Sequence, residues 1–227
     1  MSTRPHSLAP WAITLAGWAG FAVAGATFLT LAWNVASHAP LVLLDARVAA
    51  FLHQHASPGF TRVMLLLTNA HSTVAVAIFG LAFAAILWRM RERYWILTLA
   101  LALGGGMALN VLLKHVYERA RPHFDDPFVT LNSFSFPSGH TAGATLFYGV
   151  LAAFLVSRTY DRGLRTLFVT VAVAMVMLVG LSRMYLGAHY LSDVLAAACS
   201  SVAWLALCLS SVHALVRRRM AAGASGA

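Results

Sequence analysis

The stretch SFPSGHTAGATLFYGV, Ser135–Val150, places a proline, a serine, a glycine and a histidine directly ahead of an apolar run. The run continues without a charge to Ser157, which is about the shortest length that crosses a hydrocarbon core as a helix. A turn uses proline and glycine, but it has no use for His140. What this histidine does depends on where the other polar residues of the chain lie.

The composition indicates a membrane protein. Of the 227 residues, 60% are hydrophobic and 10% are charged, whereas about 25% are charged in soluble domains. Because backbone groups in lipid must bond internally, long uncharged runs are expected to be helices. The fold class predicted is all-α, an integral-membrane bundle of six transmembrane helices. The six runs are Trp11–Trp33, a run within Val63–Trp88 that starts near Thr73, Tyr94–Leu113, Thr141–Ser157, Thr166–Ser182 and Val194–Val216.

The first run has an alternative interpretation, a cleaved signal peptide. A membrane helix is preferred, because the run is longer than a signal h-region and no clear small-x-small cleavage site follows it. We expect residues 1–227 to form a single membrane-embedded domain. A surface amphipathic helix is predicted near 36–60, with apolar residues at helical spacing in Leu41–His55, and a disordered tail near 220–227.

Basic residues predict the orientation. When loops are assigned alternately to two sides, ten of the sixteen Lys and Arg residues fall on one side, at residue 4 and within 89–93, 158–165 and 217–219. The positive-inside rule makes that side cytoplasmic, so both termini are expected there, in a bacterial-type inner (plasma) membrane. The rule also accounts for the net charge of +9, and nucleic acid is not expected as a partner. The oligomeric state is left open.

Two smaller features bear on helix packing. Gly104–Gly106 interrupt the third run, and close packing against a neighbouring helix is favoured over a bend. Cys199 and Cys208 lie nine residues apart in the sixth run, on nearly opposite helix faces, so they are not expected to pair.

Polar chemistry is gathered in two outer loops, Lys114–His140 and Ser182–Asp193, which hold four of the seven carboxylates. Lys114 and Arg121 are seven residues apart, so a third helix that continued to Pro122 would carry both on one face. A guanidinium fork and an ammonium both suit phosphate oxygens. In isolation, such a pair more often reflects basic side chains that extend to lipid head groups.

The sequence Pro137-Ser138-Gly139-His140 opens the fourth helix. Ser138 is expected to be the N-cap, and Gly139 lets the backbone come close to a ligand. The free N–H groups of the first turn would then form an anion site. Ordinary capping explains the serine and the glycine without a ligand. A histidine at this place can also donate a proton to a group that leaves a bound phosphate.

The second outer loop carries Arg183, His189 and Asp193. If the sixth helix begins near His189, Asp193 lies one turn further on the same face. Its carboxylate can then hold one imidazole nitrogen as N–H and leave the other free to attack. Pairing would also give a carboxylate near the membrane a partner. A purely structural His–Asp pair between helices is the alternative.

Taken in order, Lys-x6-Arg-Pro, Pro-Ser-Gly-His and Ser-Arg-x5-His-x3-Asp resemble the three-part signature of the type 2 phosphatidic acid phosphatase superfamily. That superfamily includes membrane lipid phosphatases and, on soluble scaffolds, bacterial acid phosphatases and vanadium haloperoxidases. Every signature position is matched between Lys114 and Asp193, about a third of the chain. The six runs make the chain similar to the membrane branch, such as bacterial phosphatidylglycerophosphate and undecaprenyl pyrophosphate phosphatases. A haloperoxidase is least expected, because those relatives are soluble.

The resemblance implies a role for each motif residue. His189 would be the nucleophile that forms a phosphohistidine, Asp193 would orient it, and His140 would be the general acid. The remaining motif positions would hold the phosphoryl oxygens: Lys114, Arg121, Ser138, Gly139 and Arg183. No metal and no other cofactor is expected, since fixed cations and backbone donors can meet the developing charge.

Other polar residues of these loops receive lesser roles. We expect Glu118 and Arg119 to contact solvent or head groups, and Tyr185 and Tyr190 to be interfacial anchors. Four further residues suggest a metal cluster but lack the ligand spacing of zinc, so a solvated loop is preferred: His115, His123, Asp125 and Asp126.

The leading functional hypothesis is a membrane lipid phosphatase with its active site on the outer, periplasmic face. Its substrate would be a lipid phosphomonoester or pyrophosphate: undecaprenyl pyrophosphate, phosphatidylglycerophosphate or phosphatidic acid. One alternative is a lipid phosphotransferase that uses the same phosphohistidine. Another is a non-catalytic anion-binding or transport protein, although a mere binder needs no nucleophile with an orienting carboxylate. Whether the segment 41–55 gates access of the substrate is also open.

Overall fold

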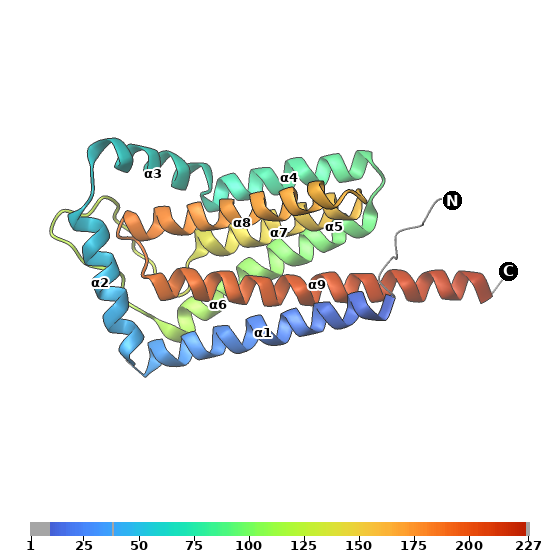
Figure 1. The fold of residues 1–227 in the computed structure, drawn as a ribbon, viewed down its shortest axis with the longest axis horizontal. Coiled ribbons are helices and arrows are strands. Elements are labelled where there is room, and N and C mark those ends of the chain that lie inside the picture. The colour runs from blue at the N-terminus through green and yellow to red at the C-terminus, as the bar shows by residue number, and fades with distance from the viewer. Residues whose placement is uncertain (1–9, 38, 226–227) are drawn as a thin grey trace.

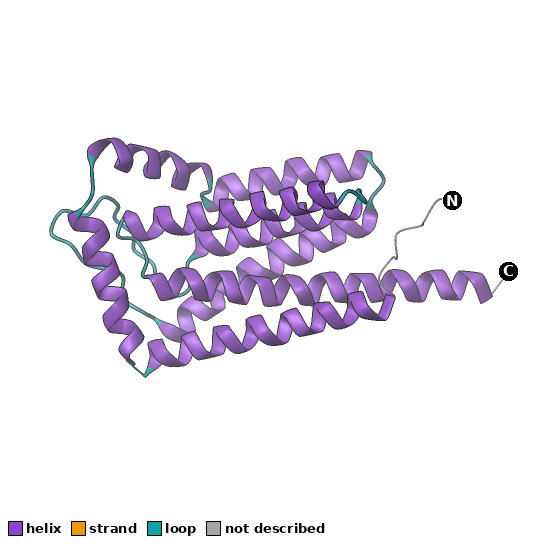
Figure 2. Cartoon of the chain, viewed as in Figure 1, coloured by secondary structure: helices purple, strands orange, loops and turns teal. Residues whose placement is uncertain are grey.

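The fold was analysed in a computed structural model that describes residues 10–37 and 39–225, and within these residues the regular structure is entirely helical (Figure 2). In chain order the helices are α1 (Pro10–Ala36), α2 (Pro40–Gln54), α3 (Pro58–Ala70), α4 (Thr73–Arg89), α5 (Arg93–Ala100), α6 (Gly106–Tyr117), α7 (Gly139–Ser157), α8 (Arg162–Tyr185) and α9 (Leu191–Ser225). A π-helical segment, Leu101–Gly105, joins α5 to α6 into one continuous rod.

The prediction of an all-α membrane bundle is confirmed. Five described segments are long and apolar enough to cross a bilayer: Gly17–Ala36, Arg93–Tyr117, Gly139–Ser157, Arg162–Tyr185 and Leu191–Ala221. The pair α3 and α4 makes a sixth candidate, bent by 49° at the break between them. Large apolar side chains such as Trp33, Leu81 and Trp88 are more than 70% exposed on these rods, as expected for surfaces in contact with lipid.

The two ends of the bundle differ in content. At one end, α2 lies across the rods and the segment 118–138 runs beside it (Figure 1). The opposite end carries the short connections 90–92 and 158–161 together with the far end of α9 (Figure 1). The alternate assignment of loops to two sides is therefore reproduced among the described residues. Arg4, which entered the orientation argument, lies outside them.

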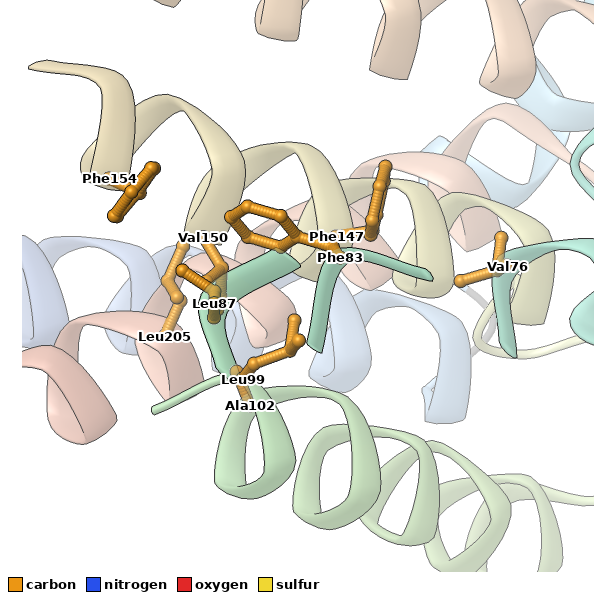
Figure 3. Close-up of a cluster of buried hydrophobic side chains, with 9 residues drawn as sticks. All are labelled: Val76, Phe83, Leu87, Leu99, Ala102, Phe147, Val150, Phe154 and Leu205. Atoms are coloured by element: carbon orange, nitrogen blue, oxygen red, sulfur yellow. The ribbon is translucent and has the colours of Figure 1, made fainter. Parts of the chain in front are cut away.

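The core lies around α7, the most enclosed of the candidate spans. Its Phe147, Val150 and Phe154 meet side chains of α4, α5 and α9, as Figure 3 shows. The partners drawn there are Val76, Phe83, Leu87, Leu99, Ala102 and Leu205. This packing fixes the depth of α7, and with it the position of the Ser138–His140 turn at its N-terminus.

The glycine interruption is a site of close packing, as expected. A Cβ at Gly105 would lie 2.4 Å from the Trp204 ring, and one at Gly106 would lie 2.5 Å from a methyl of Leu146. The indole Nε1 of Trp204 donates to the Leu101 carbonyl at 3.0 Å, beside the π segment. The glycines thus bring the rod formed by α5 and α6 against α7 and α9.

Three details of the secondary structure differ from expectation. The polar segment after α2 forms a second helix, α3, which the sequence analysis did not separate from the connector. The third span ends at Tyr117 and not at Pro122, because Glu118 takes a left-handed conformation with φ 42°. Finally, α9 continues to Ser225, so the tail expected to be disordered is helical to that point. Residues 226 and 227 lie outside the described part.

Candidate active site

The three predicted motif segments meet at the end of the bundle that carries α2. The Ser138 N–H donates to the Asp193 carbonyl at 3.1 Å, which joins the start of α7 to the start of α9. Arg121 reaches the same place from the loop after α6, where its Nη1 donates to the Ala188 carbonyl at 2.6 Å. Sequence-distant residues therefore surround a single site.

His189 and Asp193 form the centre of this site. His189 lies two residues before α9, and its Nδ1 lies 3.5 Å from Oδ2 of Asp193 and 3.4 Å from the Ser135 hydroxyl. The Ser135 hydroxyl and the Tyr190 N–H, the latter at 2.9 Å, also donate to Asp193 Oδ2. Since an ionised carboxylate only accepts, it favours the tautomer with a proton on Nδ1. Nε2 then keeps its lone pair.

That lone pair faces a cation. Nη1 of Arg121 lies 3.2 Å from Nε2 of His189. The imidazole is 2% exposed, and burial, with Arg121 and Arg183 opposing the Asp193 carboxylate, lowers the pKa of His189 to about 4. The ring is therefore neutral near pH 7, which is the form that a nucleophile requires.

Lys114 and Arg121 approach the site in a way that sequence spacing did not predict. Because α6 ends at Tyr117, only Lys114 stands on a helix, and the same-face argument for the pair is wrong. Both side chains converge on the following loop. Lys114 Nζ donates to the Phe134 carbonyl at 2.5 Å, and Arg121 Nη2 donates to the Ser133 hydroxyl at 2.9 Å.

The start of α7 has the predicted geometry. The Ser138 hydroxyl caps the helix, accepting from the Thr141 N–H at 3.5 Å and from the Thr141 hydroxyl at 3.0 Å. The N–H groups of Gly139 and His140 in the first turn have no partner within the helix, as at any helix N-terminus. His140 is half-buried and lies within electrostatic range of Arg183 and His189. A helix start, a histidine and a second histidine thus share one polar region.

Arg183 completes the set of cations. Its guanidinium is 3% exposed at the end of α8, and Nη1 donates to the Thr68 hydroxyl of α3 at 2.6 Å. Its Nε is buried without a hydrogen-bond partner among the described residues. A buried guanidinium with an unused donor is suited to bind an anion.

Arg119 belongs to the site although its sequence position did not predict it. We expected it to contact solvent or head groups, and this expectation is wrong: its side chain is 10% exposed and pairs with two buried carboxylates. Nη1 lies 2.6 Å from Asp193 Oδ1, and Nη2 lies 2.8 Å from Asp45 Oδ2. Burial opposes the charge, but Asp193 and Asp45 together raise the pKa of Arg119. Glu118, by contrast, is exposed as expected.

The two tyrosines are also more than interfacial anchors. Tyr185 is 3% exposed, and its hydroxyl accepts from the Ser57 N–H at 3.0 Å, which ties α8 to the start of α3. The Tyr190 ring lies under the Arg119 guanidinium, 4.3 Å from its carbon. Tyr185 therefore joins two helices near the site, and Tyr190 contacts Arg119 within it.

The remaining polar loop residues lie apart from the cluster. His115 is exposed and bonds only to its own helix, at the Val111 carbonyl. Asp126 pairs with His53 of α2 at 2.8 Å, and His53 stacks on Phe124 with 4.0 Å between ring centroids. These contacts join α2 to the segment 118–138.

Comparison with known proteins identifies the family to which this chain belongs. Residues 93–217 match the model of the PAP2 superfamily. The chain belongs to this superfamily. All the predicted motif residues lie in the matched region, and the resemblance found in the sequence is thereby confirmed.

Individual relatives point to the membrane branch. Phosphatidylglycerophosphatase B of Bacillus subtilis is 42% identical over 100 residues, which are 44% of this chain and 49% of that protein. The chain thus matches about half the length of this curated relative. The crystal structure of a transmembrane PAP2 type phosphatidylglycerolphosphate phosphatase from Bacillus subtilis superposes with a TM-score of 0.76 at 29% identity, covering 83% of this chain and 93% of that chain.

A second solved structure shares the fold. Aquifex aeolicus LpxE superposes with a TM-score of 0.60 at 21% identity, covering 73% of this chain and 94% of that chain. This PAP2 chain is therefore a multi-pass membrane protein with the fold of membrane PAP2 proteins.

Proposed function

We propose that this PAP2 protein hydrolyses a lipid phosphomonoester or pyrophosphate through a phosphohistidine on His189. The observation that carries the proposal is the orientation of this ring. Asp193 faces Nδ1, while Nε2 faces the polar region that Arg121, Lys114 and Arg183 line. A neutral imidazole with its lone pair directed at clustered cations is arranged to attack a bound phosphoryl group.

The reaction then has two balanced steps. The Nε2 lone pair of His189 forms an N–P bond while the bond from phosphorus to the lipid oxygen breaks, and that oxygen takes a proton from the imidazolium form of His140, which becomes neutral. Water next attacks phosphorus and gives a proton to His140. The N–P bond breaks, its electrons return to Nε2, and orthophosphate is released. Lys114, Arg121, Arg183 and the first-turn N–H groups of α7 hold the phosphoryl oxygens, so the three cations meet charge that a metal ion would otherwise meet.

The substrate class follows from the membrane setting. A lipid can leave its tail beside the rods while its phosphate reaches the helix ends. A largely apolar groove of about 490 Å³ lies between α1 and the end of α6, lined by Leu29, Thr30, Ala32, Trp33, Ala36 and Tyr117. The Tyr117 ring also packs on Phe136, 4.9 Å between centroids, next to the start of α7. Of the three candidate lipids, the named Bacillus relative supports phosphatidylglycerophosphate over undecaprenyl pyrophosphate and phosphatidic acid.

The location proposed is the inner membrane with cytoplasmic termini and a periplasmic active site. The support is the distribution of arginines, because the end of the bundle opposite α2 carries those at 89–93, 158–165 and 217–219.

The test is release of phosphate by purified protein in chelator, with each of the three lipids as substrate. His189→Ala should abolish release, whereas His115→Ala, a matched change at an exposed histidine, should leave it intact. Full release by the His189→Ala protein would refute the mechanism. Transfer of labelled phosphate into another lipid, with none released, would identify a phosphotransferase instead.

A further inference from the structure

We propose that Asp45 of α2 is a positioning residue for this reaction, holding through Arg119 and the first turn of α9 the Asp193 carboxylate that orients His189. The inference rests on the proposed function. It adds a residue that lies outside the family signature and outside the region matched by the family model, residues 93–217.

The contacts of Asp45 point to the beginning of α9. This carboxylate is fully buried, although α2 lies across one end of the bundle (Figure 1). Oδ1 accepts from the Ser192 N–H at 2.9 Å, and Oδ2 accepts from the Ser192 hydroxyl at 2.5 Å. The residue before α9 is Tyr190, whose side chain does not cap the helix. Asp45 therefore caps α9 from another helix.

Arg119 connects this cap to the catalytic pair. Its guanidinium lies between the two carboxylates, 2.8 Å from Asp45 and 2.6 Å from Asp193, and it also donates to the Ser192 hydroxyl at 2.7 Å. Every oxygen of the two carboxylates has a donor among the described residues. The network is closed, so a change at Asp45 must be transmitted to Arg119 or to the α9 turn.

Charge gives the connection a chemical consequence. Attack by Nε2 leaves positive charge on the His189 ring, and Asp193 stabilises that charge through Nδ1–H. Arg119 competes with the ring for the same carboxylate. Because Asp45 shares Arg119, less of the guanidinium charge is directed at Asp193, and more of the Asp193 charge remains available to His189.

The rival interpretation is a purely structural link between α2 and α9. It predicts lower stability when Asp45 is changed but no specific effect on the His189 ring. The two interpretations differ in four measurements: kcat against KM, dependence on Asp193, the tautomer of His189, and the effect of a neighbouring control on the same helix.

The primary variant is Asp45→Asn, which keeps the shape and one acceptor for Ser192 N–H but removes the charge. We expect kcat to fall on the order of tenfold, with KM little changed. Losses of this size are typical when a residue that orients a functional histidine is changed. Arg47→Gln, on the exposed face of α2, should retain wild-type values. With radiolabelled substrate, Asp45→Asn should cost little further activity in an Asp193→Asn background, because the carboxylate through which it acts is gone.

A second variant and a second measurement test the proposal even if Asp45→Asn does not fold. Ser192→Ala removes the hydroxyl that bridges Asp45 and Arg119 but leaves their direct ion pair. It should lower kcat in the same direction, by less than Asp45→Asn, and it serves as the test if Asp45→Asn fails to fold. In ¹⁵N-histidine NMR spectra at pH 7, wild-type His189 should carry its proton on Nδ1, and either variant should populate the other tautomer.

Three outcomes would overturn the inference: wild-type kcat in folded Asp45→Asn or Ser192→Ala, an unchanged tautomer of His189, or the same loss with and without Asp193. A wild-type protein that releases no phosphate from any lipid would refute the proposed function, whereas the tautomer would still report on the Asp45 network.

Discussion

His189, the proposed nucleophile, is buried, and its titration should be visible in the stability of the protein. The ring takes up a proton near pH 6.5 in the unfolded chain and near pH 4 in the folded one. Between these values the unfolded state binds more protons, so the free energy of unfolding falls as the pH is lowered.

We therefore expect the thermal midpoint of wild type to drop between pH 6.5 and 4 by more than that of His189→Gln, with parallel behaviour above pH 6.5. The measurement is thermal unfolding in detergent across this pH range. A gap between the two proteins that does not change with pH would contradict the buried, neutral ring.

Arg121 offers a test of geometry against charge. Its guanidinium donates to Ser133, Phe134 and Ala188 as well as facing His189, a fork that a lysine ammonium cannot reproduce. Arg121→Lys should lower kcat/KM by about 10- to 100-fold, since hydrogen bonds from charged groups contribute about 1.5–3 kcal/mol. Arg62→Lys, at an exposed position of α3, is the matched control. Equal activity of the two variants would mean that only the positive charge of Arg121 matters, and not the geometry of its guanidinium.

Residue types at signature spacing were enough to predict that His140, His189 and Asp193 lie in one polar region, while their roles stay a proposal. They were not enough for Arg119, because its partner Asp45 is 74 residues away and lies on a helix assigned to the surface. A buried ion pair of this kind has no local pattern. Its one signal was a carboxylate on a surface helix otherwise rich in apolar residues.

At the scale of elements, two glycines of the third span allow a test of whether glycine is needed there for close helix packing. Gly105→Ala would place a methyl 2.4 Å from Trp204, whereas Gly104 has open space around it. We expect Gly105→Ala to lose about 1–3 kcal/mol of stability through overpacking. Gly104→Ala should be neutral or gain up to about 1 kcal/mol.

Thermal unfolding with Trp fluorescence measures both variants under the same conditions. If Gly105→Ala is as stable as Gly104→Ala, the rod formed by α5 and α6 does not depend on this contact.

Five of the six spans were predictable to within four residues, because a helix is the only way for an uncharged run in lipid to satisfy its backbone hydrogen bonds, whereas α9 runs nine residues past the predicted Val216. The end of α6 was not predictable in this way. Proline signals a helix end, but α6 stops before it, at a left-handed Glu118 that tertiary contacts of the next residue hold in place. Similarly, α3 is too short to span a membrane alone. It forms a candidate span only together with α4, from which it is bent by 49°.

For the whole molecule, the proposed orientation predicts which end of the bundle water-soluble reagents reach from outside the cell. In a background with both native cysteines replaced, Asp125→Cys should react with an impermeant maleimide on intact cells. Tyr160→Cys, 85% exposed beside α8, should react only after the cells are opened. Labelling of intact cells at residue 160 alone would reverse the orientation.

The bundle and its common polar end followed from the order of runs and loops in the sequence. That residues 1–227 form a single domain stays a prediction, since the family match spans only 93–217. The sequence did not show how the surface helix α2 is attached, because that depends on pairs between distant segments.

The Asp45–Ser192 contact joins residues 147 positions apart, nearly two thirds of the chain. During synthesis, α2 leaves the ribosome long before the helix that it caps. His189, the proposed nucleophile, emerges just ahead of that helix, α9. A nascent chain therefore carries no working hydrolase until its final segment has been threaded into the bilayer, so lipid turnover starts only with finished molecules.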